Sequence, residues 1–178
     1  MIARIHKRQY KLVTMRARMI LDVGSGDPNR LHVYLKGQNV FHVDIDRQAY
    51  SIETQCDIHN LPFKENSFQI VHASHILEHI TNPNQAIKEL KRVSSKYVII
   101  RVPNGLSRRW GESPEHIYSW NRYTLENLLK RHFKHVTVKP TFRVAEGLSF
   151  YKKITFRLKT YLRSILWELN EITAVCEK

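Results

Sequence analysis

The alternation of β-branched runs with helical patterns is the feature that most constrains the fold of this chain. Short runs with β-branched residues occur at residues 19–23, 39–44, 51–56, 68–73 and 97–102. After the fourth run, Asn82 and Pro83 predict the start of a helix that turns Ala86, Ile87, Leu90 and Val93 to one face. Parallel strands need such crossover connections, so the sequence predicts an α/β fold with a mostly parallel sheet and helices on both of its faces.

Three further elements are predicted outside these runs. Asp27 and Pro28 predict a short helix after the first strand. Thr124 is predicted to cap a helix with Leu125, Leu128, Leu129 and Phe133 inward, and residues 135–138 resume strand character.

The last predicted element is an amphipathic helix from about Ile154 to Val175. Its apolar stripe runs from Leu158 to Ile172, and basic residues are concentrated in its first half. Large apolar side chains on such a stripe must be covered. We therefore expect this helix either to close the core or to pair two subunits into a homodimer.

Charge is the strongest compositional signal. The 178 residues include 29 lysines and arginines against 16 acids, a formal net charge of +13, and positive charge is densest in residues 1–18 and 152–163. Such a field attracts nucleic acid or another anionic partner, although a merely soluble surface or a protein from a hot habitat would also account for it. Two cysteines, no signal peptide and no apolar run of membrane-spanning length predict a cytoplasmic protein without a membrane span.

A glycine loop directly after the first strand indicates a ligand site. Gly24 and Gly26 allow a sharp turn and close approach of the backbone to a ligand, and Asp44 ends the next strand, where a carboxylate can accept both hydroxyls of a ribose. The dinucleotide fingerprint would require glycine at position 29, which is Asn29. A nucleotide-like cofactor other than NAD is therefore expected.

Downstream motifs identify a family resemblance. Residues 57–71, with Asp57 followed by Leu61-Pro62-Phe63, and then Leu77-Glu78-His79, resemble the class I S-adenosylmethionine-dependent methyltransferases over about residues 19–139. The resemblance implies a Rossmann-like seven-strand-type sheet with the last strand antiparallel, shortened between Arg47 and Thr54. We expect one domain over residues 1–178, in which a basic segment (1–18) precedes the cofactor-binding core and an appendage (140–178) follows it.

The resemblance also implies how the donor is bound. Gly24, Ser25 and Gly26 would wrap its methionine end, with Asp22 beside them, and S-adenosylhomocysteine would be the product. The other implied cofactor-binding residues are Asp44 and Ile45 at the ribose, Asp57 and Ile58 at the adenine, and Ala73 and Ser74 near the sulfonium.

Several of these positions have alternative interpretations. Asp22 can instead accept the amide hydrogens of the glycine loop, and Cys56 can be a small buried apolar residue. Pro28 stands where a third glycine is usual and Gln69 where an aspartate is usual in the family. These two departures keep open a module that binds S-adenosylmethionine without catalysis.

The segment His75-Ile-Leu-Glu78-His79 is literally H-x-x-E-H, the zinc signature of one metallopeptidase class. A zinc peptidase is therefore the third alternative, but the signature needs a long helix, whereas this segment follows a strand closely. We predict no metal site, and His79 either as a general base at the acceptor or as a packed side chain.

The acceptor is expected to contact the segment that follows the fifth strand. Ligands of open α/β folds bind at that edge of the sheet. The candidate acceptor residues are His75, Arg108, Arg109, His116, Tyr118 and Trp120. The alternative is an ordinary surface loop with aromatic anchors, and the acceptor can be a nucleic acid or a small molecule.

Overall fold

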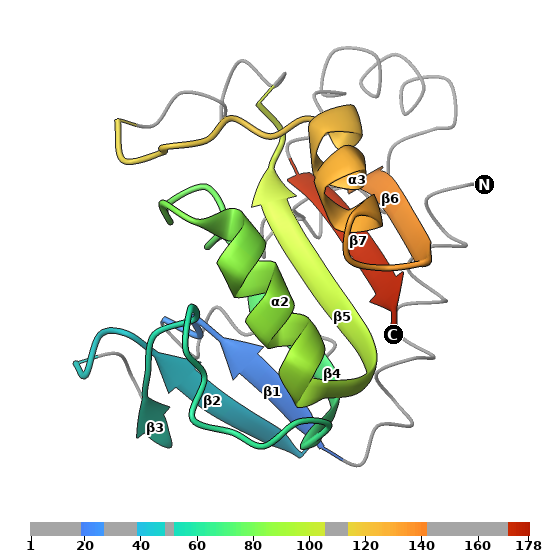
Figure 1. Ribbon diagram of the computed structural model, residues 1–178. Helices are drawn as coiled ribbons and strands as arrows, with labels where there is room; N and C mark the ends of the chain where they lie inside the picture. The colour runs from blue at the N-terminus through green and yellow to red at the C-terminus, as the bar shows by residue number, and fades with distance from the viewer. Residues whose placement is uncertain (1–18, 27–38, 49–51, 106–113, 142–170) are drawn as a thin grey trace, which may run out of the picture.

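The predicted sheet is present. The computed structural model describes residues 19–26, 39–48, 52–105, 114–141 and 171–178. They form one seven-stranded sheet in the order β3-β2-β1-β4-β5-β7-β6 (Figure 1). Its strands are β1 (Ile20–Val23), β2 (Val40–Asp44), β3 (Thr54–Gln55), β4 (Phe68–Ser74), β5 (Ser94–Pro103), β6 (His135–Thr141) and β7 (Glu171–Glu177).

Strand directions agree with the family resemblance. The pairs β1–β2, β2–β3, β1–β4 and β4–β5 are parallel, whereas β7 runs antiparallel to both β5 and β6. The carboxyl ends of β1, β2, β4 and β5 therefore lie at one edge of the sheet. Only two residues form β3, which fits the shortened connection predicted before it.

Helix α2 (Pro83–Val93) begins where the sequence predicts. The Asn82 side chain accepts a hydrogen bond from the backbone of Gln85, at 3.1 Å, and Pro83 occupies the first turn. Lys91 and Arg92 lie in the last turn, where the helix dipole favours positive charge. The predicted inward face of α2 is buried, which confirms its 3.6-residue periodicity.

Helix α3 (Arg122–Lys130) begins earlier than predicted. Its N-cap is Asn121, whose side chain accepts from the amides of Tyr123 and Thr124. Thr124 completes a capping box from within the helix, because its hydroxyl accepts from the Asn121 amide at 3.0 Å. The prediction of Thr124 as the N-cap is wrong. Threonine is suited both to the N-cap and to the third helical position of a capping box, and Thr124 occupies the third position. Leu125 and Leu129 are buried as predicted.

The C-terminal helix prediction is wrong over residues 171–175. These residues belong to β7, which is inserted between β5 and β6. Ile172, Ala174 and Cys176 are fully buried, with the alternation of a strand. The position of Ile172 fits the apolar face of a helix as well as the buried face of a strand. Pairing with the two neighbouring strands favours the strand. The rest of that predicted helix, and the helix predicted at Asp27 and Pro28, lie outside the described residues.

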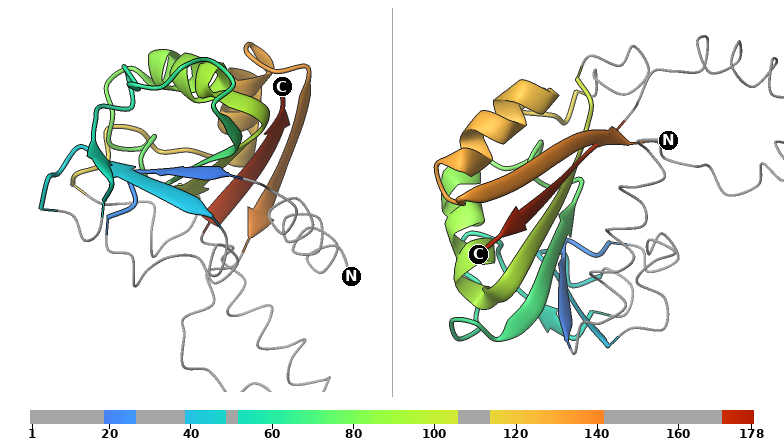
Figure 2. Two further views of the ribbon diagram at one scale, coloured as in Figure 1. Left: turned by 90° about the horizontal axis from the view of Figure 1, so that it is seen from below. Right: turned by 90° about the vertical axis from the view of Figure 1, so that its right-hand side faces the viewer.

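The two described helices lie on the same face of the sheet (Figure 2). The main core lies between this face and the helices, and it includes Leu21, Val71, Ile100 and Ile172. On the opposite face a smaller cluster of Ile20, Ile70 and Ile99 is fully buried, with Val40, Tyr97 and Val175 beside it. Both faces of the sheet therefore bury apolar side chains.

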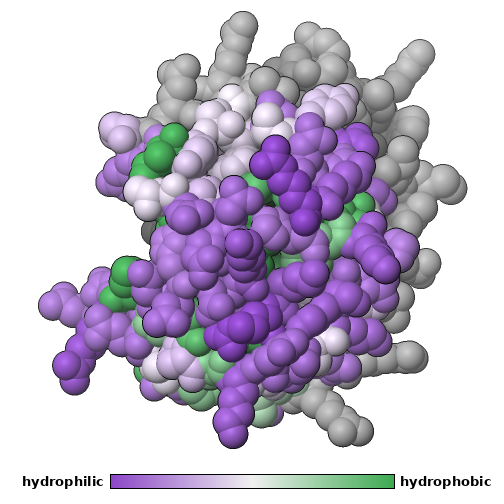
Figure 3. Space-filling model, in the orientation of Figure 1, coloured by the Kyte–Doolittle hydropathy of each residue, from purple (hydrophilic) through white to green (hydrophobic). Residues whose placement is uncertain are grey.

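Outside the core, the described surface is mainly polar. Figure 3 shows that hydrophilic side chains dominate the described part of the face that carries α2 and α3. None of the helices formed by the described residues is long and apolar enough to cross a membrane.

Both cysteines are free. Cys56 packs against the core as a small apolar side chain, as predicted, and burial raises the pKa of its thiol to about 11. Burial raises the pKa of Cys176 to about 12. Both thiols are therefore protonated near neutral pH and poorly suited to act as nucleophiles.

Candidate active site

The glycine loop is fastened to the end of β2. Gly24 and Gly26 have φ angles of 66° and 53°, in the left-handed region that favours glycine. The amides of Gly24 and Ser25 both donate to the Val43 carbonyl, and the Gly26 amide donates to Asp44 Oδ2 at 2.9 Å. A Cβ atom on Gly26 would meet nothing within 4 Å, so described residues leave this side of the loop open.

Asp44 connects the two strand ends. Its Oδ2 accepts from Gly26, and its Oδ1 accepts from the Asp46 amide at 3.0 Å. Each carboxylate oxygen has a further lone pair. Ile45, the next residue, is 66% exposed despite its apolar side chain. The carboxylate is thus fixed in orientation and can still accept hydrogen bonds from a ligand beside an apolar surface.

Helix α2 holds the segment that follows β3. The Glu89 carboxylate accepts from the Leu61 amide at 2.9 Å, and the Arg92 guanidinium donates to the carbonyls of Leu61 and Phe63. The hydrogen bond from Arg92, together with that from the Leu61 amide, keeps the pKa of Glu89 below its ordinary value despite partial burial. Polar groups of one helix therefore fix the Leu-Pro-Phe motif.

Asp57 and Ile58 lie just before this clamp. Asp57 Oδ1 accepts from the His59 amide at 2.9 Å, and its side chain is half exposed. That backbone hydrogen bond is the main cause of a lowered pKa for Asp57. Ile58 is buried. An exposed carboxylate and a fixed backbone are therefore available at this position for a ligand.

Asp22 pairs with two histidines across the sheet. Its neighbours on β2 and β4 are His42 and His72, in direct register, and its carboxylate lies 3.4 and 2.6 Å from their Nδ1 atoms. Burial by itself raises the pKa of Asp22, but the two histidines outweigh burial and hold it well below the ordinary range. The loop amides donate to Val43 and Asp44, so the predicted contact between Asp22 and those amides is not the one formed.

His75 contacts β7. It has a φ of 58°, and its Nε2 lies 2.9 Å from Glu171 Oε1, while Arg101 forms a buried ion pair with the other carboxylate oxygen. Burial raises the pKa of Glu171, but the hydrogen bond from His75 and the charge of Arg101 outweigh burial and lower it. Sequence reasoning missed Glu171 because it placed this residue in a helix.

The metallopeptidase arrangement is not formed. Residues 75–79 make turns after β4 rather than the long helix that the signature requires. His75 faces Glu171, whereas the His79 ring lies against the His116 ring, edge to face, with 4.9 Å between centroids. Although both histidines approach Glu78, they do not lie on one helix as the signature requires, and the zinc-peptidase alternative is wrong.

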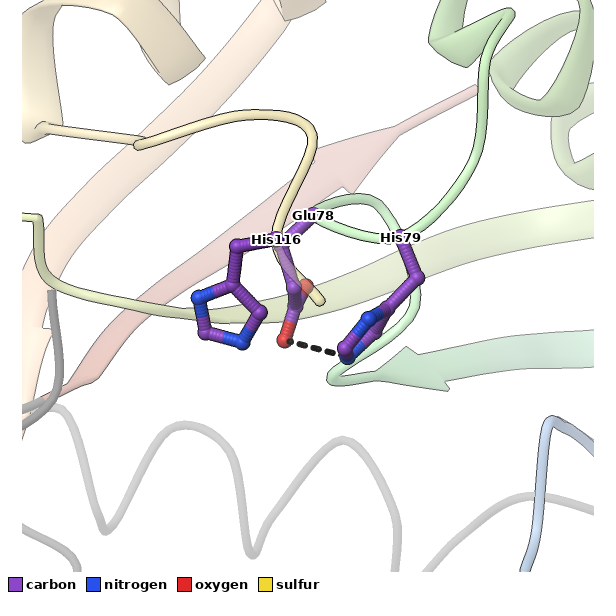
Figure 4. Close-up of side chains that lie close together, drawn as sticks. All are labelled: Glu78, His79 and His116. Carbon is purple, nitrogen blue, oxygen red and sulfur yellow. Dashed lines mark ion pairs between the residues drawn. The ribbon is translucent and has the colours of Figure 1, made fainter. Parts of the chain in front are cut away.

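Three side chains from two distant segments meet beside β4 (Figure 4). Glu78 is buried, His116 is half-buried and His79 is exposed, and their ligand atoms lie within 4.8 Å of one another. The Glu78 carbonyl accepts from the amides of Ile117 and Tyr118, at 2.7 and 3.1 Å. These backbone bonds bring His116 to the turn.

The aromatic residues of this segment anchor it. Tyr118 and Trp120 stack with 5.4 Å between ring centroids, and the Tyr118 hydroxyl donates to the Thr81 carbonyl at 3.1 Å. Trp120 is 8% exposed and belongs to the main core. These contacts favour the anchoring interpretation for Trp120. Arg108 and Arg109 lie outside the described residues.

The glycine loop and the turn after β4 are in contact. A Cβ atom on Gly24 would lie 2.4 Å from the Cδ1 atom of Ile76, the residue after His75. Ser74 lies half-buried at the end of β4, and Ala73 packs in the main core. The described candidate residues on β1, β2 and β4 therefore share one edge of the sheet.

Comparison with known proteins agrees with this geometry. The model of a methyltransferase domain family matches residues 21–100. The resemblance to S-adenosylmethionine-dependent methyltransferases is therefore confirmed over residues 21–100. Among curated proteins, none matches this sequence.

Solved structures share the fold of this methyltransferase. A SAM-dependent methyltransferase from Archaeoglobus fulgidus aligns with a TM-score of 0.69 and 17% identity, over 99% of this chain and 93% of that one. A SAM-dependent methyltransferase and possible histamine N-methyltransferase from Thermotoga maritima gives 0.66 and 17%, over 98% and 95%. A methyltransferase complexed with the Haloferax volcanii Trm112 activator gives 0.67 and 14%, over 99% and 91%.

The predicted enzyme class and methyl donor are therefore confirmed, and a module without catalysis is not supported. S-adenosylmethionine carries a sulfonium and an amino acid but no phosphate, which suits a loop without lysine. Methyl transfer requires the acceptor atom in line with the methyl group, and a base when the acceptor starts protonated. The methyltransferase thus needs few catalytic side chains.

Proposed function

We propose that the protein binds S-adenosylmethionine across the glycine loop and Asp44 and transfers its methyl group to an acceptor held beside the turn after β4. The observation that carries this proposal is the hydrogen bond from the Gly26 amide to the Asp44 carboxylate. It joins the loop suited to the methionine end to the carboxylate suited to the ribose. Asp57, with the Ile58 backbone, would contact the adenine, and Ile45 would cover one ring face.

The remaining cofactor contacts belong to the methyl-transfer end. Gly24, Ser25 and Ser74 would lie near the sulfonium, while Asp22 and Ala73 support that end from within the sheet and core. Direct contact of Asp22 with the donor is the less favoured role, because its carboxylate already faces two histidines.

The acceptor side is formed by His79, His116 and Tyr118, with His75 and Trp120 behind them. His79 Nδ1 lies 3.2 Å from the Glu115 carbonyl, which can only accept, so Nδ1 donates. Nε2 of the neutral ring is then free to take a proton from an acceptor. This supports His79 as the general base, with the two predicted arginines, Arg108 and Arg109, supplying charge for an anionic acceptor.

The acceptor class we favour is nucleic acid, because the net charge of +13 attracts polyanions. A small amine is the second candidate, since one structural neighbour is described as a possible histamine N-methyltransferase. Transfer of labelled methyl to RNA, DNA and an amine mixture distinguishes them. Binding to nucleic acid should also fall steeply with salt, and no complex at low salt would favour the small acceptor.

Calorimetric titration of the full chain tests the donor site. We expect S-adenosylmethionine and S-adenosylhomocysteine to bind with one-to-one stoichiometry and NAD not to bind. Absence of S-adenosylmethionine binding at millimolar concentration would contradict the proposal.

The remaining predictions concern organisation. We propose one domain over residues 1–178, in the cytoplasm, with pairing through the segment that precedes β7. One neighbour is complexed with an activator protein, so a different protein partner is the alternative. Light scattering of the isolated chain distinguishes a dimer from a monomer that awaits such a partner.

A further inference from the structure

Glu78 is a buried carboxylate without hydrogen bonds from the described residues. It is 1% exposed, and neither Oε1 nor Oε2 has a hydrogen-bond partner there. His75 Nδ1 lies 3.3 Å and His79 Nε2 3.9 Å from Oε1. Burying a charged carboxylate is costly unless a cation or hydrogen-bond donors compensate it. His75 also faces Glu171, so a further cation beside Glu78 would offset the remaining cost.

The ring of His79 is oriented as a metal ligand. Its Nδ1 donates to the Glu115 carbonyl, so Nε2 of the neutral ring directs a lone pair towards the Glu78 side chain. A lone pair facing a carboxylate is repulsive unless a proton or a metal ion lies between them. Histidines that bind metals typically donate their other ring nitrogen to a carbonyl or carboxylate in this way.

His116 supplies a third ligand atom. Its segment is held to the turn by four hydrogen bonds: those of Ile117 and Tyr118 to the Glu78 carbonyl, that of the Tyr118 hydroxyl to Thr81, and that of His79 to Glu115. The three ligand atoms lie within 4.8 Å of one another. Small side-chain rotations bring such atoms to the roughly 2.0–2.2 Å ligand distances of zinc.

We propose that Glu78, His79 and His116 bind a divalent transition-metal ion, for which Zn²⁺ is the probe. Two imidazoles and one carboxylate are a donor set of catalytic zinc sites, which keep a further coordination position open. The exposed side of His79 provides room for that position. This goes beyond the sequence prediction, in which H-x-x-E-H would use His75 rather than His116.

The site lies next to the glycine loop, so the metal would bind the methyl acceptor; this role rests on the proposed function. The turn that carries it packs against the glycine loop through Ile76. The open position would therefore face the acceptor, and an acceptor oxygen or nitrogen could bind there. Nε2 of His79 cannot hold a metal and accept a proton at once, so metal binding replaces the general-base role.

The test is a calorimetric titration of the untagged, chelator-treated full chain with Zn²⁺, repeated with Co²⁺ by visible absorption. Wild type should bind one equivalent, and the ion should raise its melting temperature. Glu78→Gln and His116→Ala should each weaken binding about tenfold or more, since loss of even an outer-shell partner costs about 10–100-fold. His132→Ala is the control, because His132 contacts Asn84 on another part of the surface.

Each variant is also titrated with S-adenosylmethionine. Unchanged donor binding shows that the fold is intact, and His116→Ala keeps the test valid if Glu78→Gln fails to fold. Wild type without metal binding, or Glu78→Gln binding as tightly as wild type, overturns the metal site. Failure of the proposed function is distinct, because it would appear as loss of S-adenosylmethionine binding in wild type.

Discussion

The two halves of the ligand edge are built by different kinds of contact. In the half proposed for the cofactor, the glycine loop, Asp44 and residues 57–63 are fixed mainly by backbone amides and carbonyls. In the half proposed for the acceptor, side chains from separate segments meet: His79 and Glu115 are 36 positions apart, and His75 and Glu171 are 96 positions apart.

Because of this difference, we expect substitutions in one half to weaken donor binding and substitutions in the other to destabilise the fold. Backbone-directed bonds shape a loop for one donor, and their loss should affect donor binding first. The acceptor half contains buried charges, whose separation from their partners should affect the whole fold first. Variants placed in each half therefore test whether donor binding and stability depend on separate contacts.

The largest effect is expected for Glu171→Gln. The change removes the carboxylate charge that faces buried Arg101 and His75, and breaking a buried pair typically costs about 3–5 kcal/mol. Urea unfolding measures the loss. Glu126→Gln is the control, since its pair with Lys130 on α3 is exposed and worth less than about 1 kcal/mol. Equal losses in both variants would show that the Glu171 cluster is not a structural centre.

The second largest effect is expected for Asp44→Asn, on the binding of S-adenosylmethionine. The amide keeps an acceptor for the Gly26 N–H but removes the charge that would hold the ribose, worth about 1.5–3 kcal/mol. We expect S-adenosylmethionine binding to weaken about tenfold or more, by calorimetry, with little change in melting temperature. Asp46→Asn, two residues further on, is the matched control. A large fall in melting temperature together with the loss of affinity would show that Asp44 is a structural residue.

Glu89→Gln should have a smaller and mixed effect. The substitution weakens the clamp that Glu89 and Arg92 place on Leu61, and hydrogen bonds to charged groups contribute about 1.5–3 kcal/mol. We expect a loss of roughly 1–2 kcal/mol in unfolding and severalfold weaker donor binding, because Asp57 and Ile58 precede the clamp. Exposed Glu65→Gln is the control. A stability loss without any change in affinity would separate the clamp from the donor site.

The smallest expected effect is the pH dependence of the Asp22 pair. The neighbouring carboxylate raises the pKa of His42 above 6.5, so its stabilisation is present below that value and is lost as pH rises through the raised pKa. The lowered pKa of Asp22 acts oppositely, and its stabilisation is present above 3.8 and lost as pH falls towards the lowered pKa.

His42→Asn should therefore cost less at pH about 8 than at pH about 6, by under about 1 kcal/mol. Thermal or urea unfolding at both pH values gives the comparison. A cost that is the same at both would mean that the imidazole acts by packing rather than by charge.

Residues close together in the chain were enough to predict the ends of β1 and β2 and the start of helix α2. Gly24, Gly26 and Asp44 lie at strand ends, and Asn82 and Pro83 start a helix, because turn conformation and capping depend on residues close in the chain. The same locality allowed the Leu-Pro-Phe motif to be recognised, although not the Glu89 clamp that holds it.

The contacts around His75, His79 and Glu171 depend on pairing between distant segments. Residues 171–175 carry a pattern that fits a helix as well as a strand, and their pairing with β5 and β6 selects the strand. That choice alone brings Glu171 to His75 and Arg101. Likewise, His116 lies beside Glu78 and His79 because backbone bonds join residues 117 and 118 to the turn. Contacts of this kind depend on which distant segments become neighbours, and no local pattern encodes that.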